Sequence, residues 1–567
     1  MLDRIDRWIP LAGQLRGYDR ETFQRDLTAG LTTAIMLVPQ AMAYALLAGL
    51  EPIVGLYASV LPIIVYGLLG TSRQLAVGPV AMISLLVASA VAPLAGDDPA
   101  RYAGLAALLA LMVGLLQWGM GLVRLGFLVK FLSHPVIAGF TSAAALIIGF
   151  SQLKHVLGVE IPRSHHVHEI LGHAVANLSS ADATTVAIAL VSIATLLGLK
   201  RFAPRVPRFL VVVAGGALAA WGLGLDVKIV GTVPSGLPGV ALPPLGVTEI
   251  SALAPMAIAI ALVGFMESIS VAKNFARRNG YEVDSDQELH ALGLANVAGS
   301  LFGAYPTTGG FSRTAVNAQA GASTGLAGLV TAGVVVLTLL FLTPLFTFVP
   351  KAVLAAIIMT AVFGLVDVAT ARHLWHVDRA DLMLMGVTFV ATLTVGIEQG
   401  ILTGVLASLV WFVWRTSQPH VAVLGRRPGH SVWRNVARYP EAVCPPEILV
   451  VRVDAPLFFA NTAFLKQTIE ALAEGRDQLQ HLIVDAKAIG SVDSQALDTL
   501  QEIVEAFQRR GVVVWFSGVR GPVRDRFRID GLWDHVGDEH FVERVQEAAD
   551  QIDVPGKDTP EPQRRAM

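Results

Sequence analysis

About fourteen apolar runs follow one another along most of the chain, separated by short polar connections. A run of about 20 apolar residues is long enough to cross a bilayer as a helix. Several runs are shorter than this or are broken by Gly and Pro, so we do not expect all of them to cross as straight helices. The runs lie at 27–47, 53–70, 79–94, 104–122, 131–150, 182–199, 209–225, 252–272, 289–304, 312–321, 326–345, 350–366, 380–396 and 399–416.

A different pattern begins at about residue 420, where charged residues become frequent. Alternating strand and helix periodicities there predict a small α/β domain, followed by a tail too polar to pack, which we expect to be disordered. The predicted strands lie at 448–453, 481–485 and 512–517, and the predicted helices at about 463–474, 494–509, 521–530 and 539–552. The chain is thus divided into an N-terminal segment 1–26, a membrane domain 27–417, a soluble domain 418–553 and the tail 554–567.

The positions of Lys and Arg predict the orientation of the chain, because cytoplasmic loops carry an excess of these residues. With the amino terminus inside, every strongly basic connection falls on the cytoplasmic side. These connections lie near Arg73, Arg124 with Lys130, 200–208, 273–278, 372–379 and Arg415. The N-terminal segment lacks the apolar core and cleavage site of a signal peptide. We therefore expect the amino terminus and the soluble domain to lie in the cytoplasm.

The composition excludes several classes of protein. With 54% hydrophobic and 15% charged residues and a mean hydropathy of +0.59, a chain of 567 residues is too apolar for a soluble protein. The formal net charge of −2 and the lack of a basic tract argue against nucleic-acid binding. The sequence has no Walker motif for ATP hydrolysis and predicts neither an enzyme nor a cofactor.

The cysteine and histidine residues do not predict a metal site. Cys444 is the single cysteine, which excludes an intramolecular disulfide and a zinc-type cluster. Four histidines, His165, His166, His168 and His173, lie in one loop that the orientation places outside. They could bind a metal there, but we interpret them as solvated loop residues.

Two opposite charges stand alone in long apolar stretches. Arg313 is the only Lys, Arg, Asp or Glu in 289–350, and Glu267 is the only one in 250–272. A guanidinium cannot lose its charge in a protein, so at bilayer depth Arg313 needs a polar cavity or a partner. A structural ion pair, or a position near a helix end, is the alternative interpretation. Together the two charges predict one polar cavity.

Two short segments carry helix-breaking residues just before a short helix. They are 75–94, with Gly78-Pro79, and 305–321, with Gly309-Gly310. Interrupted helices at corresponding places in two halves of a membrane protein indicate a transporter site. Ser312 could cap the second of these helices. If both helix N-termini point at the bilayer midplane, an anion there meets two positive dipole ends as well as Arg313.

Polar side chains on two further helices can face the same cavity. Gln40 and Tyr44 are four residues apart in the first run, so they share a helix face, although they could instead be polar contacts between packed helices. Glu267 shares a face with Gly264 and Ser268. Because Gly264 is small, we expect it to leave space beside the carboxylate, which favours Glu267 as an ion-coupling residue.

Long motifs in this chain resemble those of the sulfate permease family of anion transporters. The motifs are VPQAMAYALLAGLEPIVGLYAS (38–59), GTSRQLAVGPVAMISL (70–85), FMESISVAKNFARRNGYEVDSDQELHALGLANVAGSLFGAYPTTGGFSRTAVNAQAG (265–321) and the carboxy-terminal domain, in the family's order. The resemblance implies a polytopic α-helical membrane protein of about fourteen segments in a seven-plus-seven inverted repeat with two half-helices. It also implies a core and a gate domain, a homodimer, and a cytoplasmic α/β STAS domain.

The resemblance also implies roles for particular residues. It matches Glu267 to the acidic residue linked to cation coupling. Asp493 and Ser494 match the Asp-Ser pair of anti-sigma-factor antagonists, but Gln495 and Ala496 replace the usual Ser-Gly. This departure argues against phosphorylation of Ser494 and favours a helix N-cap role for Asp493 or Ser494. The family's anion site falls on Gln40, Tyr44, Pro79, Val80, Ser312 and Arg313.

These observations predict a secondary active anion transporter of the bacterial inner membrane, coupled to protons through Glu267. Sulfate is the leading substrate by resemblance, and bicarbonate and C4-dicarboxylates are carried within the same family. Sodium coupling and anion exchange stay open, because no residue spacing separates them from proton coupling. A membrane-anchored anion sensor that acts through its STAS domain is the alternative from a different class.

Overall fold

The structure is a computed structural model that describes residues 9–96, 98–127, 133–161, 167–203 and 206–552. The chain separates into two compact units, Met1–Ser408 and Leu409–Met567, which we call the first and second units. His165 and His166 lie outside the described residues, as does the predicted disordered tail 554–567.

The first unit is built almost wholly of helices, and each predicted apolar run contains one of them. Their bounds are α2 Pro10–Gln14, α3 Arg20–Leu47, α4 Pro52–Tyr57, α5 Leu61–Leu69, α6 Ala81–Ala95, α7 Pro99–Leu122, α8 His134–Ser151, α9 Leu153–Leu157, α10 Val167–Ala176, η2 Leu178–Ser180, α11 Ala183–Phe202, α12 Arg208–Gly222, α13 Val247–Asn279, α14 Ser285–Ser300, α15 Phe311–Gln319, α16 Leu326–Leu337, η3 Thr338–Leu342, η4 Thr343–Phe346, α17 Lys351–Val362, η5 Phe363–Leu365, α18 Val368–Val377, α19 Arg379–Thr394 and α20 Ile397–Ser417, the last of which continues into the second unit.

Eight helical stretches among the described residues are long and apolar enough to cross a membrane. They are Arg20–Leu47, Pro52–Leu69, Pro99–Leu122, His134–Leu157, Ala183–Phe202, Val247–Asn279, Leu326–Phe346 and Lys351–Val377. Two shorter apolar helices, Ala81–Ala95 and Arg208–Gly222, accompany them. The expectation that some apolar runs are too short to cross as straight helices is therefore confirmed.

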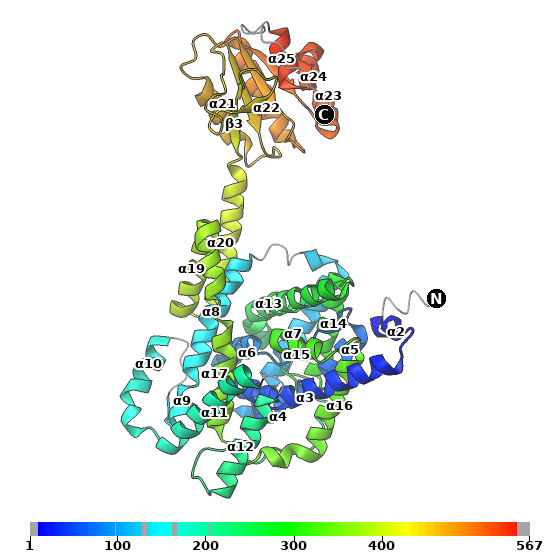
Figure 1. Ribbon diagram of the computed structural model, residues 1–567, viewed down its shortest axis with the longest axis vertical. Coiled ribbons are helices and arrows are strands. Elements are labelled where there is room, and N and C mark those ends of the chain that lie inside the picture. Colours follow the sequence, from blue (N-terminus) through cyan, green and yellow to red (C-terminus); the bar gives the residue numbers. More distant parts are fainter. Residues whose placement is uncertain (1–8, 97, 128–132, 162–166, 204–205, 553–567) are drawn as a thin grey trace. The chain divides into compact units, whose positions relative to one another are not determined.

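Glycines bring several of these helices into close contact, as is common in membranes, where small residues let helix backbones approach. A Cβ atom on Gly114 of α7 would lie 2.7 Å from the carbonyl oxygen of Gly293 on α14. One on Gly293 would lie 2.5 Å from the backbone nitrogen of Trp118. Likewise, one on Gly30 of α3 would lie 2.6 Å from the carbonyl oxygen of Ala327 on α16. The helix pairs α7–α14 and α3–α16 are therefore packed backbone against backbone (Figure 1).

A two-stranded antiparallel sheet joins the two interrupted segments. Strand β1 (Val77–Gly78) precedes α6, strand β2 (Thr308–Gly309) precedes α15, and the register pairs Val77 with Gly309. Gly78 has φ = +147°, which side chains other than glycine rarely adopt. The sheet holds the starts of two short helices side by side, although more than 200 residues separate them in the sequence.

The second unit contains a six-stranded sheet with the order β4-β3-β5-β6-β7-β8. Strands β5 to β8 are parallel, and β3 pairs with β5 antiparallel. Helix α21 packs on one side of the sheet and α25 on the other (Figure 1). Both faces of β5 are therefore buried, which explains why the strand is apolar on both. The bounds are β3 Val421–Arg426, β4 Trp433–Asn435, β5 Ile448–Val453, α21 Thr462–Ala473, β6 His481–Asp485, α22 Ser494–Arg509, β7 Val513–Ser517, α23 Gly521–Asp530, α24 Leu532–Val536, η6 Asp538–His540, β8 Phe541–Val542 and α25 Val545–Gln551.

The sequence pattern identified the three central strands but missed β3, β4 and β8. The helix predicted at 539–552 is wrong in its first part, because helix α25 begins only at Val545. Before it, Phe541 and Val542 pair with β7 as a strand. The ring of Phe541 stacks on Trp533 at 3.6 Å between centroids and on Phe516 at 5.5 Å, so tertiary packing overrides the helical pattern there.

Candidate functional site

A cavity of about 540 Å³ lies within the first unit. Helices α3, α13 and α15, which supply most of its polar side chains, pack together with α6. Seven sequence-predicted residues line it together: Gln40, Tyr44, Pro79, Val80, Glu267, Ser312 and Arg313. The polar cavity expected from the two lone charges is therefore present, and it is large enough for a small-molecule ligand.

Two helices begin at this cavity without a side-chain cap. The N-cap of α6 is Val80 and the N-cap of α15 is Gly310, and neither supplies a capping hydrogen bond from its side chain. The first N–H groups of a helix have no acceptor within the helix and carry positive dipole character. Because Ala81, Phe311 and Ser312 also line the cavity, both positive ends face the same space.

The expectation that Ser312 caps α15 is wrong. The helix begins at Phe311, so Gly310 takes the N-cap position with an extended backbone (φ −97°, ψ 128°). Ser312 is the second residue of the helix and is exposed at the cavity. Its hydroxyl is therefore available to a ligand rather than engaged with its own helix.

Arg313 is buried and is held by backbone carbonyl groups of the other interrupted segment. Its side chain is 1% exposed, which excludes a snorkelling position near a helix end. Nη1 donates a hydrogen bond to the carbonyl of Pro79 at 2.8 Å, and Nε and Nη2 lie 3.4 Å from the carbonyl oxygen of Ala76. The guanidinium has five N–H donors, and these contacts engage three of them. Arg313 thus both ties α15 to β1 and lines the cavity.

Close glycine backbones make room for this guanidinium. A Cβ atom on Gly78 would lie 3.3 Å from Nη2 of Arg313, and one on Gly310 would lie 3.1 Å from the same atom. Larger residues at these two positions would push the guanidinium out of its place between the helix starts. The helix-breaking glycines therefore have a second role, which sequence patterns alone do not reveal.

Glu267 lines the cavity from α13, and its Oε2 atom is buried without a hydrogen-bond partner. Within the described chain, the carboxylate forms no ion pair with Arg313 at 4.0 Å or less. A buried oxygen without a partner has a high free-energy cost when it is charged, and that cost falls when the group binds a proton or a cation. Glu267 is therefore chemically suited to exchange a cation with the cavity.

The space expected beside Glu267 at Gly264 is filled. The missing side chain of Gly264 faces Thr308, whose Oγ1 would lie 3.3 Å from a Cβ atom there, and Thr308 donates a hydrogen bond to the Gly264 carbonyl. Ser268 contacts Thr308 Oγ1 at 2.7 Å and accepts a hydrogen bond from Gly309 N at 2.8 Å. The small residue therefore makes room for β2, and the expected role of Gly264 is wrong.

Gln40 and Tyr44 lie on one face of α3, as their spacing predicts. Gln40 Nε2 donates a hydrogen bond to the Tyr44 hydroxyl at 2.9 Å. Both side chains are buried except where they line the cavity. The hydroxyl that accepts this bond keeps its own proton free to donate into the cavity.

A buried carboxylate that the sequence analysis overlooked holds the loop before β1. Glu288 of α14 is 0% exposed and accepts hydrogen bonds from Tyr66 Oη, Thr71 N and Thr71 Oγ1 at 2.7 Å each and from Ser72 N at 3.1 Å. These four bonds satisfy the carboxylate fully and fix the turn that leads into β1. Only the tertiary structure distinguishes this residue from the exposed carboxylates near it in sequence.

Asp26 of α3 holds the loop after α15 in a similar way. It is 0% exposed and accepts hydrogen bonds from Ser323 N at 2.7 Å, Thr324 N at 3.1 Å and Thr324 Oγ1 at 2.5 Å. The Tyr18 hydroxyl donates to Oδ2 at 2.9 Å, the oxygen that also accepts from Thr324 Oγ1, whereas the two backbone N–H groups donate to Oδ1. Buried carboxylates therefore fix both the loop before β1 and the loop after α15.

Further polar residues line the cavity, and the sequence analysis assigned them no role there. Ser270 and Asn274 follow Glu267 by three and seven residues, a spacing that puts all three on one face of α13 and could have revealed them. Lys200 and Arg208, which we interpreted only as basic loop residues, add two positive charges. No sequence signal connected these two residues to the cavity, because they come from the ends of α11 and α12.

Asp493 and Ser494, which match the Asp-Ser pair of anti-sigma-factor antagonists, lie in the second unit. Asp493 is the N-cap of α22 and accepts hydrogen bonds from Ala496 N and Phe459 N, each at 2.8 Å. Ser494 is the exposed first residue of the helix. The cap position therefore belongs to Asp493. Within the part of the chain that the structure describes, no group of three or more His, Cys, Asp and Glu could hold a metal ion.

Comparisons with known proteins agree with this architecture. A sulfate permease family model matches residues 23–388, and a STAS domain model matches residues 439–548. Probable sulfate transporter 4.2 of Arabidopsis thaliana is 41% identical over 566 residues, covering 96% of this chain and 84% of the plant protein. The fold and these matches define a multi-pass membrane transporter with a C-terminal STAS domain.

Solved structures show the same fold. The murine Solute Carrier 26 family member A9 anion transporter in its inward-facing state superposes with a TM-score of 0.90 and 25% identity, covering 97% of this chain and 94% of that one. The transmembrane domain of the cyanobacterial bicarbonate transporter BicA gives a TM-score of 0.60 and 26% identity, covering 69% of this chain and 98% of that one. The chain belongs to the sulfate permease family.

Proposed function

We propose that the protein is a secondary active transporter that carries sulfate, or a similar small oxyanion, across the bacterial inner membrane in symport with protons. The observation that carries this proposal is the cavity in which two uncapped helix N-termini and Arg313 meet Glu267. Transport then occurs by alternating access, with a core domain that contains the cavity moving against a gate domain.

Gln40, Tyr44, Pro79, Val80, Ser312 and Arg313 form the proposed anion site. The anion accepts hydrogen bonds from the first N–H groups of α6 and α15, as anions do at helix N-termini. The Ser312 and Tyr44 hydroxyls supply further donors at the cavity wall. Arg313 adds a full positive charge, and because it already binds the carbonyl of Pro79, its position is fixed before the anion arrives.

Sulfate is preferred because the curated relative with 41% identity over almost the whole chain is a probable sulfate transporter. Bicarbonate is the alternative substrate, supported by the likeness to the bicarbonate transporter BicA. C4-dicarboxylates are a further alternative, since the volume of the cavity also accommodates organic anions.

Glu267 is the proposed coupling residue. Its unpartnered oxygen supports reversible protonation, because a neutral carboxyl group needs no countercharge in a buried site. A proton on Glu267 would also offset part of the negative charge of a bound oxyanion during the movement across the membrane. Sodium is the alternative coupling ion, and strict anion exchange is the alternative without coupling.

We further propose that the protein is a homodimer whose amino terminus and STAS domain face the cytoplasm. The distribution of Lys and Arg among the connections supports this orientation. The proposed functional divisions are a transport domain at 27–417 and a STAS domain at 418–553. Asp493 and Ser494 belong to the latter, where we propose a role in regulation rather than in transport.

Uptake into proteoliposomes tests the function directly. Labelled sulfate, bicarbonate and a C4-dicarboxylate are supplied in turn, with an imposed inward proton gradient, an imposed inward sodium gradient, or neither. We expect sulfate to accumulate with the proton gradient alone. Accumulation driven only by sodium would identify sodium instead of the proton as the coupling ion. If none of the three anions accumulates under either gradient, symport is rejected.

A further inference from the structure

The second unit contains its own polar cavity of about 360 Å³. It lies where strand β3 begins, where the parallel strand β5 ends, and beside the turn after β4. Ligands of α/β proteins commonly bind at the carboxyl ends of parallel strands. The cavity is lined by His420, Arg434, Asn435, Arg438, Tyr439, Arg452 and Asp454.

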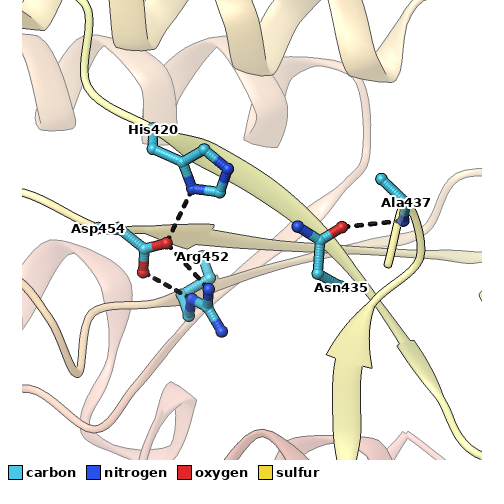
Figure 2. A network of polar contacts seen from close by, with 5 residues as sticks. All are labelled: His420, Asn435, Ala437, Arg452 and Asp454. Atoms are coloured by element: carbon cyan, nitrogen blue, oxygen red, sulfur yellow. Dashed lines mark hydrogen bonds and ion pairs between the residues drawn. The ribbon is translucent and has the colours of Figure 1, made fainter. Parts of the chain in front are cut away.

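An ion-pair network joins three of the residues that line this cavity, His420, Arg452 and Asp454 (Figure 2). Arg452 donates from Nε to Asp454 Oδ1 at 2.6 Å and from Nη2 to Asp454 Oδ2 at 2.9 Å. His420 Nδ1 lies 2.9 Å from the same Oδ2. Burial raises the pKa of Asp454, but the hydrogen bonds from Arg452 and His420 outweigh this effect and lower the pKa below its ordinary value. The carboxylate is therefore charged and holds Arg452 in one orientation.

Asn435 fixes the turn after β4, beside which the other two arginines, Arg434 and Arg438, lie. The Asn435 side chain accepts a hydrogen bond from Ala437 N at 2.9 Å, as Figure 2 shows. The Asn435 carbonyl accepts hydrogen bonds from the backbone N–H groups of Arg438 and Tyr439, each at 3.0 Å. The guanidinium of Arg434 lies 5.9 Å from the centre of the Tyr439 ring, within the range of a cation–π contact. The turn is thus ordered by its own hydrogen bonds.

The charges of the cavity do not balance. Three guanidinium groups, those of Arg434, Arg438 and Arg452, face one carboxylate, that of Asp454. The excess of two positive charges becomes three when His420 is protonated. Neither Arg434 nor Arg438 forms an ion pair with a carboxylate within the described chain. These two arginines are therefore free to meet an anion from solution.

We propose that this cavity binds a phosphate monoester. A phosphate monoester carries about −1.5 to −2 charges at pH 7, which matches the excess positive charge of the cavity. Guanidinium groups bind its oxygens in a bidentate geometry, and clusters of arginine are a recurrent means of phosphate recognition. The proposal is independent of the transport cavity, because every residue that it involves belongs to the second unit.

The volume of the cavity indicates what the phosphate is attached to. A water molecule occupies about 30 Å³ in the liquid, so about 360 Å³ corresponds to roughly a dozen water molecules. This space exceeds what a single inorganic oxyanion requires, and the exposed ring of Tyr439 offers an apolar surface to the rest of the molecule. A soluble nucleoside monophosphate and the headgroup of phosphatidic acid both combine a phosphate monoester with an organic portion.

The test uses the full-length protein in lipid nanodiscs and compares two matched double variants. Arg434→Gln with Arg438→Gln removes two positive charges from the cavity, and Arg524→Gln with Arg526→Gln removes the same charge from the exposed face of α23. The soluble probe is AMP, measured by calorimetric titration in nanodiscs without anionic lipid. The lipid probe is phosphatidic acid, measured by its retention on the protein in native mass spectrometry.

We expect one of the two probes to bind the wild-type protein and to lose affinity by about tenfold for each arginine removed from the cavity, since a hydrogen bond to a charged group has about this effect. The α23 double variant should bind like the wild type. AMP binding would identify a soluble ligand, and selective retention of phosphatidic acid would identify a lipid headgroup.

The proposal would be overturned if each probe bound the cavity double variant as tightly as it binds the wild type. So would an equal loss in both double variants, because general charge rather than the cavity would then explain the binding. If the cavity double variant fails to fold, the single variant Arg438→Gln replaces it, since its exposed side chain forms no hydrogen bond in the described structure. Sulfate uptake measured in parallel separates a failure of this site from a failure of the transport site.

Discussion

Two glutamates of the first unit, Glu288 and Glu267, are both surrounded by protein but differ in their partners. Glu288 accepts four hydrogen bonds, two of them from backbone N–H groups. Glu267 has one oxygen with no partner and faces the cavity. A buried polar group that is fully bonded stabilises one conformation, whereas one left unbonded has a free-energy cost that only a ligand or a proton can remove. The comparison distinguishes a structural residue, Glu288, from Glu267, which is suited to bind a proton or a cation.

The same distinction applies to Arg313, which lies between these two cases. Backbone carbonyls of Pro79 and Ala76 engage part of its guanidinium, and the remaining N–H groups are available to the cavity. We therefore expect Arg313 variants to affect both the frame and the ligand.

The largest effect should follow removal of the Glu288 carboxylate. Glu288→Ala leaves the Tyr66 hydroxyl and the Thr71 and Ser72 N–H groups without acceptors, at about 1–3 kcal/mol each. We expect the protein to unfold at a much lower temperature or to fail to assemble, as judged by size-exclusion chromatography after heating. Glu288→Gln keeps one carbonyl oxygen for the backbone donors and should lose less. An alanine variant as heat-stable as the wild type would show that the bonds do not stabilise the fold.

Glu267→Gln should have the opposite profile. No hydrogen bond to Oε2 is lost, so we expect normal assembly and thermal stability. Because an amide cannot take up and release a proton, uptake driven by an inward proton gradient should collapse, while exchange of one anion for another survives. Parallel uptake and exchange assays in proteoliposomes measure the two activities.

Glu249→Gln is the matched control, because Glu249 lies on the same helix, α13, but does not line the cavity. It should retain proton-driven uptake. If Glu267→Gln loses folding, binding and exchange together, Glu267 is a structural residue and the contrast with Glu288 fails.

Arg313→Gln should weaken anion binding by about 1.5–3 kcal/mol, the contribution of a hydrogen bond to a charged group. Arg313→Lys keeps the charge, but a single ammonium cannot reproduce the planar fork that contacts two carbonyl groups. We expect the lysine variant to bind more weakly than the wild type and more tightly than the glutamine variant. Equilibrium binding of labelled sulfate measures all three proteins, and unchanged affinity in both variants would leave Arg313 only a structural role.

The smallest effects should come from Asp493 and Ser494, the pair for which we propose a regulatory role. Asp493→Ala removes a helix N-cap and should destabilise the second unit by about 1 kcal/mol. Asp493→Asn preserves the acceptor for Ala496 N and should recover most of this loss. Ser494→Ala should change stability by less than about 0.5 kcal/mol, because the side chain is exposed. Chemical denaturation followed by tryptophan fluorescence ranks the three variants, and a serine variant that is the least stable would contradict the assignment of the cap.

Much of the fold follows from hydrophobic periodicity. Each apolar run contains a helix, because long stretches without charge leave the backbone few alternatives in a membrane. Strands β4 and β8 were missed because they are short and lie at the two edges of the sheet, where the pattern of burial is weak. Strand β3 has six residues inside the sheet, and its mixture of buried and half-buried positions did not stand out in the sequence. The N-cap of α15 was predicted two residues too late, because Ser is usually preferred at this position but Gly310 takes it here.

The residues that line the cavity could be predicted from isolated charges, helix-breaking residues and motif resemblance. Their partners could not. No sequence signal shows that Thr308 fills the space at Gly264, or that the carbonyl of Pro79 binds Arg313, because these contacts join segments far apart in the chain. The sequence shows Glu267 as a lone charge and Glu288 as one of several neighbouring acidic residues, but only their hydrogen bonds show that Glu288 is fully bonded and Glu267 is not.

The pairing of β1 with β2 has a consequence for selectivity. Backbone hydrogen bonds, among them Gly310 N to Ala76 O at 3.1 Å, join the two helix starts. If the proposed alternating access leaves these bonds intact, the donors that surround an anion keep their mutual spacing throughout the transport cycle. We expect the protein to rank competing anions in the same order during import and during export, so that a substrate excluded on one side is excluded on the other.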